Sequence, residues 1–111
     1  MTNLISGPSL TNFRRGRVMP KFLVMHVPFP TPLSVEEATP ILKRAVGAMT
    51  AEAYWISSYC QANAEGKAVR VWCRWDGTSI EAVRDAVAKL MPEMPVEGVY
   101  PLVVLDSGDF R

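Results

Sequence analysis

The chain has 111 residues, of which 49% are hydrophobic and 21% are charged, and its formal net charge is +1. This length and composition predict one globular domain with an ordinary core. Residues 1–18 hold three arginines and no acidic residue, so the rest of the chain has 9 basic and 11 acidic side chains and a net charge of −2. A slightly acidic domain does not favour a surface that follows a phosphate backbone, and we expect no nucleic-acid partner.

The first 18 residues do not resemble a signal peptide, because their arginines follow the apolar residues instead of preceding them. We interpret them as a disordered or mis-started leader before one domain at residues 19–111, with an organelle transit peptide as the alternative. Cys60 and Cys73 are too few for the disulfide framework of a small secreted domain. No apolar run approaches the roughly 20 residues of a membrane span. We therefore expect a cytoplasmic protein with reduced thiols and no membrane partner.

The first regular elements are a strand and a helix. Residues 21–27 are short, apolar and β-rich, as in a central strand. Ser34 and Glu37 form a capping box, which predicts a helix to about residue 49 with one apolar face. Pro40 interrupts this pattern, so either the helix kinks or Thr39 and Pro40 begin a second helical segment.

A β-hairpin is expected next, because two β-rich stretches at residues 53–61 and 68–75 flank a turn with Gly66. In the second stretch Val71, Cys73 and Trp75 alternate with polar or larger residues. This alternation predicts one buried and one open face.

The chain is expected to end with a helix and a strand. A second capping box at residues 78–81 opens the helix, which stops before Pro92. The strand is predicted over about residues 98–105, at a sheet edge because Pro101 has no amide to donate. The order β-α-β-β-α-β predicts an α+β, ferredoxin-like sandwich, in which a four-stranded antiparallel sheet carries two helices on one face. The first and third strands are expected to be central.

Two helices cover only one face of such a sheet. Large aromatic side chains beside arginines favour an interface or a binding groove on the other face. The residues expected there are Trp55, Tyr59, Arg70, Trp72 and Arg74. We expect a homodimer that packs sheet to sheet as a dimeric α/β barrel, and a pocket for a small-molecule ligand between the sheets is a second, functional reading of the same face.

The only histidine, His26, ends the first strand and is the main candidate for chemistry. Imidazole and thiolate suit zinc, nickel or copper, so His26 and Cys73 are candidate ligands of a transition metal. Whether they share a face depends on strand register, since a slip of one residue reverses it. Two other readings stay open: His26 as the acid or base of an enzyme acting on a small aromatic or apolar compound, or as a hydrogen-bonded core residue.

Several stretches of the chain resemble a bacterial family of small domains of unknown function. They are residues 19–26, 55–59, 72–77 and 81–84. The best-known type of this family is a nickel-binding, nickel-responsive ferredoxin-like protein that forms dimers. The resemblance implies a divalent transition metal such as nickel at His26 and Cys73. Members of that type often carry further histidines in the second helix, which are missing here, so a partner subunit, Tyr59 or water would have to complete the site.

Overall fold

A computed structural model describes residues 19–111, and the predicted leader at residues 1–18 lies outside them. In chain order the elements are β1 (Lys21–His26), α1 (Val35–Ala48), β2 (Ala53–Ala62), β3 (Ala68–Gly77), α2 (Ile80–Leu90), β4 (Val96–Pro101) and the 3₁₀ turn η1 (Ser107–Phe110). The expected β-α-β-β-α-β order is confirmed.

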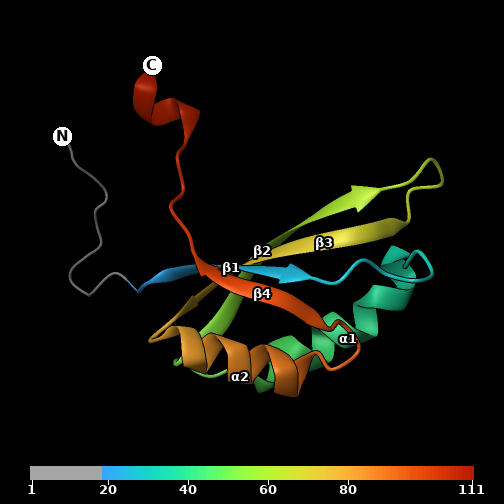
Figure 1. Cartoon of the computed structure of the whole chain (residues 1–111), viewed down its shortest axis with the longest axis horizontal. Coiled ribbons are helices and arrows are strands. Elements are labelled where there is room, and N and C mark those ends of the chain that lie inside the picture. Colours follow the sequence, from blue (N-terminus) through green and yellow to red (C-terminus); the bar gives the residue numbers. More distant parts are fainter. Residues whose placement is uncertain (1–18) are drawn as a thin grey trace.

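The four strands form one antiparallel sheet in the order β2-β3-β1-β4. Both helices lie against the same face of this sheet (Figure 1). The α+β, ferredoxin-like arrangement and the central position of β1 and β3 therefore agree with the prediction. No helix within residues 19–111 is both long and apolar enough to cross a bilayer.

Alternation along β1 and β3 decides which side chains enter the core. Burial alternates residue by residue along β1 and from Arg70 onward in β3, because successive side chains of a strand point to opposite faces. The buried set faces the helices and comprises Phe22, Val24 and His26 from β1 with Val71, Cys73 and Trp75 from β3. Val83 and Val87 of α2 and Ala45 of α1 close this core from the other side.

Helix α1 begins at the predicted capping box. Ser34 accepts a hydrogen bond from the Glu37 amide at 3.1 Å, and the Glu37 carboxylate accepts one from the Ser34 amide at 2.9 Å. The helix continues through Pro40, so the alternative that a second segment begins there is wrong. A single missing amide removes one hydrogen bond of the helix, and the rest of the helix tolerates that loss.

Helix α2 is capped one residue later than its sequence pattern predicts. The cap is Ser79, which accepts a hydrogen bond from the Ala82 amide at 3.1 Å. Glu81 is then the second helical residue and not the third, so it does not return a bond to the cap as a capping box requires.

The last strand ends earlier than predicted, at Pro101 and not at residue 105. Its neighbour β1 begins at Lys21, and the final backbone hydrogen bond between the two runs from Leu102 N to Lys21 O, at 2.9 Å. Within residues 19–111 no strand lies beside the chain beyond Leu102, so the ladder of the described sheet ends there.

Candidate functional site

His26 lies at the end of β1 inside the core. Its relative exposure is 0%, and it is the only buried polar residue of the described chain. It pairs across the sheet with Val96 of β4, next to a register shift that leaves Glu97 as an extra residue. Because His26 follows Val24 by two positions, and Val24 pairs with Cys73 of β3, His26 and Cys73 point to the same, helix-covered side.

Both ring nitrogens of His26 have partners. Nδ1 lies 2.8 Å from the carbonyl oxygen of Met94, and Nε2 lies 3.3 Å from Cys73 Sγ. A carbonyl oxygen can only accept, so Nδ1 carries the hydrogen and Nε2 is the acceptor. Burial lowers the pKa of His26 below its ordinary value, although hydrogen bonds to the Met94 and Pro95 carbonyls raise it in part. The ring is therefore a neutral imidazole with a fixed tautomer at neutral pH.

The Cys73 thiol continues the chain of hydrogen bonds. Burial raises its pKa to about 11, so it is a thiol and its S–H donates to Nε2 of His26. Ser58 Oγ lies 3.0 Å from Cys73 Sγ and receives the indole N–H of Trp55 at 2.8 Å. Every donor in this chain has an acceptor if Trp55 donates to Ser58, Ser58 to Cys73, Cys73 to His26 and His26 to the Met94 carbonyl. We call these five residues the buried relay.

The buried relay consists of neutral groups. A reactive cysteine needs a thiolate, which forms when the thiol pKa is lowered by nearby positive charge, whereas the pKa of Cys73 is raised. The imidazole holds no proton on Nε2 and has no contact with water. Its clearest role is to satisfy buried polar atoms, because each unsatisfied one would cost about 1–3 kcal/mol.

The five residues predicted for the uncovered face do not all lie there. Tyr59 pairs with Trp72, but Trp55 pairs with Trp75 on the helix-covered side. The register shifts between Trp55 and Ser57, so Ile56 is an extra residue. Such a bulge moves every later side chain to the opposite face. The expectation that Trp55 and Tyr59 share a face is therefore wrong, and Trp55 belongs to the buried relay.

The other four residues lie together on the uncovered face. Tyr59 is 68% exposed, while Trp72 is half-buried beneath the Arg70 guanidinium, whose central carbon lies 5.4 Å from the ring centroid. Arg70 forms an ion pair with Glu97 at 2.6 Å, and Arg74 forms one with Asp76 at 3.5 Å. This face thus combines aromatic surface with charges that are already paired.

A metal ion between His26 and Cys73 would find too few ligands. Within residues 19–111 no group of three or more His, Cys, Asp or Glu side chains is placed to hold an ion. Tyr59, considered as a further ligand, points to the other side of the sheet. Catalytic zinc sites use three protein ligands and structural ones four, so one subunit does not fit a resident nickel ion. Nickel binding stays a prediction from the resemblance.

A cavity of about 160 Å³ lies between α1 and the β2–β3 hairpin. Apolar side chains form most of its wall, among them Leu33, Ala38, Leu42, Val71 and Met94. The cavity touches the buried relay through Ser58 and Met94, but His26 does not line it. The sequence did not predict this cavity, because its wall combines residues of the β1–α1 loop, a helix and two strands.

The polar side chains of this cavity are already engaged. Ser34 Oγ binds the Glu37 amide, Thr39 Oγ1 donates to the Val35 carbonyl at 2.7 Å, and Ser58 belongs to the relay. Cys60 also lines the cavity; its thiol is free, and burial raises its pKa. The cavity has no carboxylate, histidine or amine in its wall, so it offers an apolar surface and one neutral thiol.

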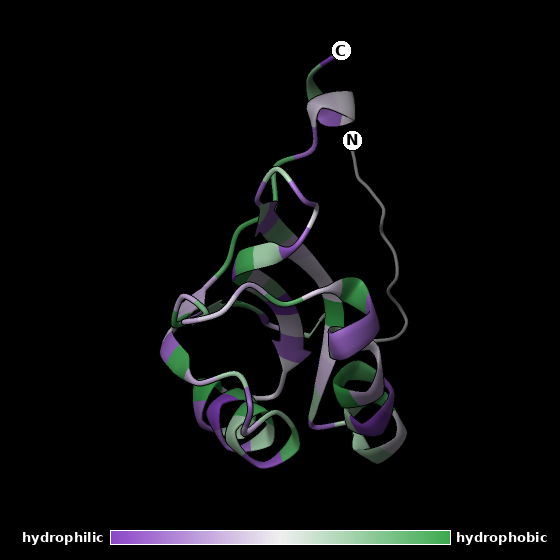
Figure 2. Ribbon diagram, turned by 90° about the vertical axis from the view of Figure 1, so that its right-hand side faces the viewer, coloured by the Kyte–Doolittle hydropathy of each residue, from purple (hydrophilic) through white to green (hydrophobic). Residues whose placement is uncertain are grey.

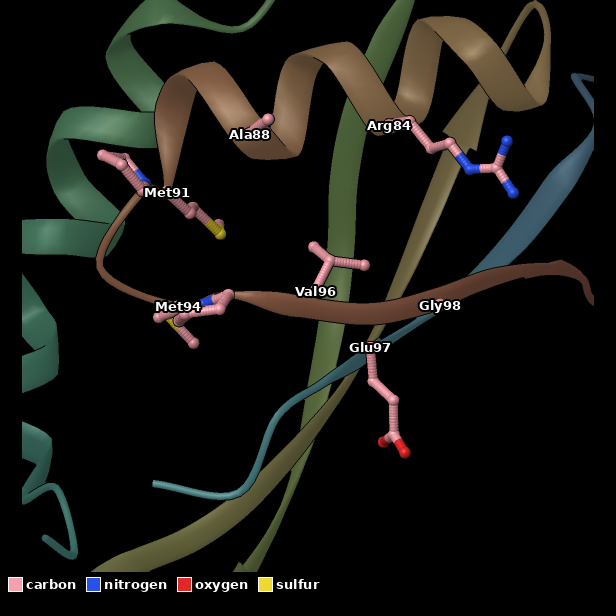
Figure 3. A pocket seen from close by; sticks show the side chains of 9 residues that line it. Arg84, Ala88, Met91, Met94, Val96, Glu97 and Gly98 are labelled. Atoms are coloured by element: carbon pink, nitrogen blue, oxygen red, sulfur yellow. The ribbon is translucent and has the colours of Figure 1, made fainter. Parts of the chain in front are cut away.

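A second hollow, of about 520 Å³, lies between α2 and the edge strand β4. Figure 3 shows Met91, Met94 and Val96 around it and the Arg84 side chain along the helix, while Glu97 points away from it. It borders the open solvent side of β4 and contains no cluster of titratable groups, so it offers no evident chemistry.

Comparisons of the chain with protein-family models, with curated proteins and with solved structures found no match. The resemblance to the nickel-responsive family therefore stays a prediction, and the site is interpreted from its geometry.

Proposed function

We propose that this chain is a homodimeric binding protein that holds a small apolar or aromatic molecule in the cavity between α1 and the β2–β3 hairpin. The observation that carries the proposal is the wall of that cavity: it is mostly apolar, and each of its three hydroxyls already has a hydrogen-bond partner within the protein. An apolar molecule leaves those bonds intact, whereas a charged one would find no carboxylate, histidine or amine in the wall to pair with.

The size of the cavity suits a small ligand. Its accessible volume of about 160 Å³ is close to that of a dry cavity of about 150 Å³ that holds benzene, although this one opens to solvent beside the exposed residues Val35, Cys60 and Ala62. The ligand class is therefore a single aromatic ring or a short branched hydrocarbon. A binding role is better supported than catalysis, because His26, the acid or base of the enzyme hypothesis, is outside the wall and has both nitrogens engaged.

The dimer part of the proposal is supported by the uncovered sheet face. Tyr59 and Tyr100 are 68% and 50% exposed, and Leu23, Met25 and Trp72 lie half-buried in the strands around them. An aromatic and aliphatic surface of this kind is typical of the centre of an interface. This face is also separate from the cavity, so ligand binding does not depend on the second copy.

Toluene and phenol, titrated into ¹⁵N-labelled protein, test the ligand part by amide chemical shifts. We expect saturable shifts at Ala38, Leu42 and Val71, with a dissociation constant of about 1 mM or lower for toluene and weaker binding of phenol. Ala38→Leu should fill the cavity and weaken toluene binding at least tenfold. Ala48→Leu, at an exposed position of the same helix outside the cavity wall, is the matched control. Toluene that shifts no resonance of the cavity wall would overturn the ligand proposal.

A further inference from the structure

The chain continues past β4 as an apolar arm at residues 102–110. Val103, Leu105 and Phe110 are 80%, 75% and 74% exposed, and Val104 is 48% exposed. In both overall views the arm rises from the sheet on the side opposite the helices, and it stands clear of the domain (Figures 1 and 2). In Figure 2 much of its extended part has the colour of hydrophobic residues.

The arm has a defined shape but almost no support from its own domain. Leu102 N bonds to Lys21 O, and within residues 19–111 the later hydrogen bonds of the arm are internal. Asp106 caps the closing turn, since its carboxylate accepts from the Gly108 amide at 2.8 Å and its carbonyl accepts from the Asp109 amide at 3.0 Å. Single exposed apolar residues are ordinary, but four on one short projecting segment indicate a surface that becomes covered.

We infer that this arm clasps a second copy of the chain that is docked on the uncovered sheet face. The inference rests on the dimer of the proposed function and adds the part of the chain that holds it together. Arm and face lie on the same side of the sheet (Figure 1), so a body docked on the face stands beside the arm.

The length of the arm fits this arrangement. Packed sheets lie about 10 Å apart, and four extended residues span about 13 Å at roughly 3.3 Å each. Residues 102–105 are therefore long enough to pass the partner's sheet. Val103, Val104 and Leu105 would then lie along the partner, and the turn η1 would lie beyond its sheet.

A second copy of the chain would cover both the uncovered sheet face and the apolar arm. One two-fold axis pairs two faces and covers two arms, and such closed symmetric dimers are the commonest soluble oligomers. The charges of the face do not oppose it, because Arg70 and Arg74 are each paired within their own subunit. An unrelated partner would have to match both the aromatic face and the arm.

Sedimentation velocity of the full chain over a concentration series tests this inference. We expect a dimer for the wild type and an increase of at least tenfold in its dissociation constant for the double variant Val103→Glu, Leu105→Glu. Val46→Glu is the matched control, because Val46 is a 53% exposed valine on α1, on the other side of the sheet. The arm variant should keep the circular dichroism spectrum of the wild type, since these side chains are exposed in their own subunit.

The outcomes distinguish a failure of the arm proposal from a failure of the dimer proposal. An arm variant that dimerises as tightly as the wild type overturns the clasp and leaves the sheet-to-sheet dimer standing. A wild type that is monomeric at all concentrations overturns both. Tyr59→Glu, on the face itself, should also weaken the dimer. If it does not, while the arm variant does, the arm holds a copy docked elsewhere and the inference is wrong as stated.

Discussion

The two faces of the sheet are built from the same strands but differ in their polar side chains: those on one face are neutral, and those on the other are charged. On the helix-covered face, His26 and Cys73 are buried and neutral, and hydrogen bonds satisfy them. On the uncovered face, Arg70 and Arg74 keep their charge beside Glu97 and Asp76. The difference follows from desolvation: a fully buried charge is costly, whereas these pairs are partly exposed and compensate each other's charge. The covered face therefore serves stability, and the uncovered face is free for association.

Replacing His26, on the helix-covered face, should lower the free energy of unfolding more than any other substitution considered below. His26→Ala leaves a cavity in the core and removes the partners of the Cys73 thiol and the Met94 carbonyl. We expect the free energy of unfolding to fall by about 2–4 kcal/mol in urea denaturation. Val27→Ala, at the adjacent and 41% exposed position, should cost less than about 1 kcal/mol.

A loss below about 0.5 kcal/mol for His26→Ala, within the range of ordinary surface substitutions, would show that the buried relay does not stabilise the core. Calorimetry with Ni²⁺ on the wild-type protein separates this role from the metal hypothesis. Two donors per subunit lead us to expect no stoichiometric binding. Binding that His26→Ala abolishes would instead support the nickel site that the resemblance implies.

The pH dependence of stability should show a smaller effect with a defined sign. Burial lowers the pKa of His26 in the folded protein below its ordinary value of 6.5. Below pH 6.5 the unfolded chain therefore binds more protons than the folded one. As the pH is lowered from 6.5 to the pKa of folded His26, the free energy of unfolding decreases. Above pH 6.5 this contribution is constant.

The chain has one histidine, so its ring resonance follows this group alone. In an NMR titration of the folded protein, we expect the His26 Cε1 proton to titrate with a midpoint below 6.5. A midpoint at or above 6.5 would contradict the neutral, buried ring. Replacing His26 with Gln should flatten the fall in stability between pH 6.5 and 5.5.

The smallest effect is expected on the uncovered face. Glu97→Gln breaks the ion pair with Arg70, whose two side chains are 29% and 49% exposed. Exposed ion pairs contribute about 0–1 kcal/mol and weaken with salt. Urea denaturation at one protein concentration, with and without added salt, should show a loss below about 1 kcal/mol that shrinks as salt is added. A loss as large as that of His26→Ala would remove the contrast between the faces.

Sequence patterns predicted much of the fold because they record local physics. The capping box of Ser34 and Glu37 in α1, the alternation of Val71, Cys73 and Trp75, and the turn at Gly66, which has a positive φ of 79°, each reflect a local preference of the backbone. The candidate site was predicted less well. His26 and Cys73 are adjacent, which the sequence had left open because it depends on strand register. Their partners Ser58 and Met94 were not foreseen, because they come from distant segments.

The sequence by itself determined the order of the elements, the two central strands and the histidine at the end of the first of them, since periodicity, capping and crossover handedness act along the chain. Only the tertiary structure decided which side chains meet. The extra residues Ile56 and Glu97 shift the register, and the shift at Ile56 places Tyr59 on the face opposite Trp55, which packs against the core. The cavity beside α1 and the arm beyond Leu102 likewise depend on where neighbouring strands and helices end, which no local pattern specifies.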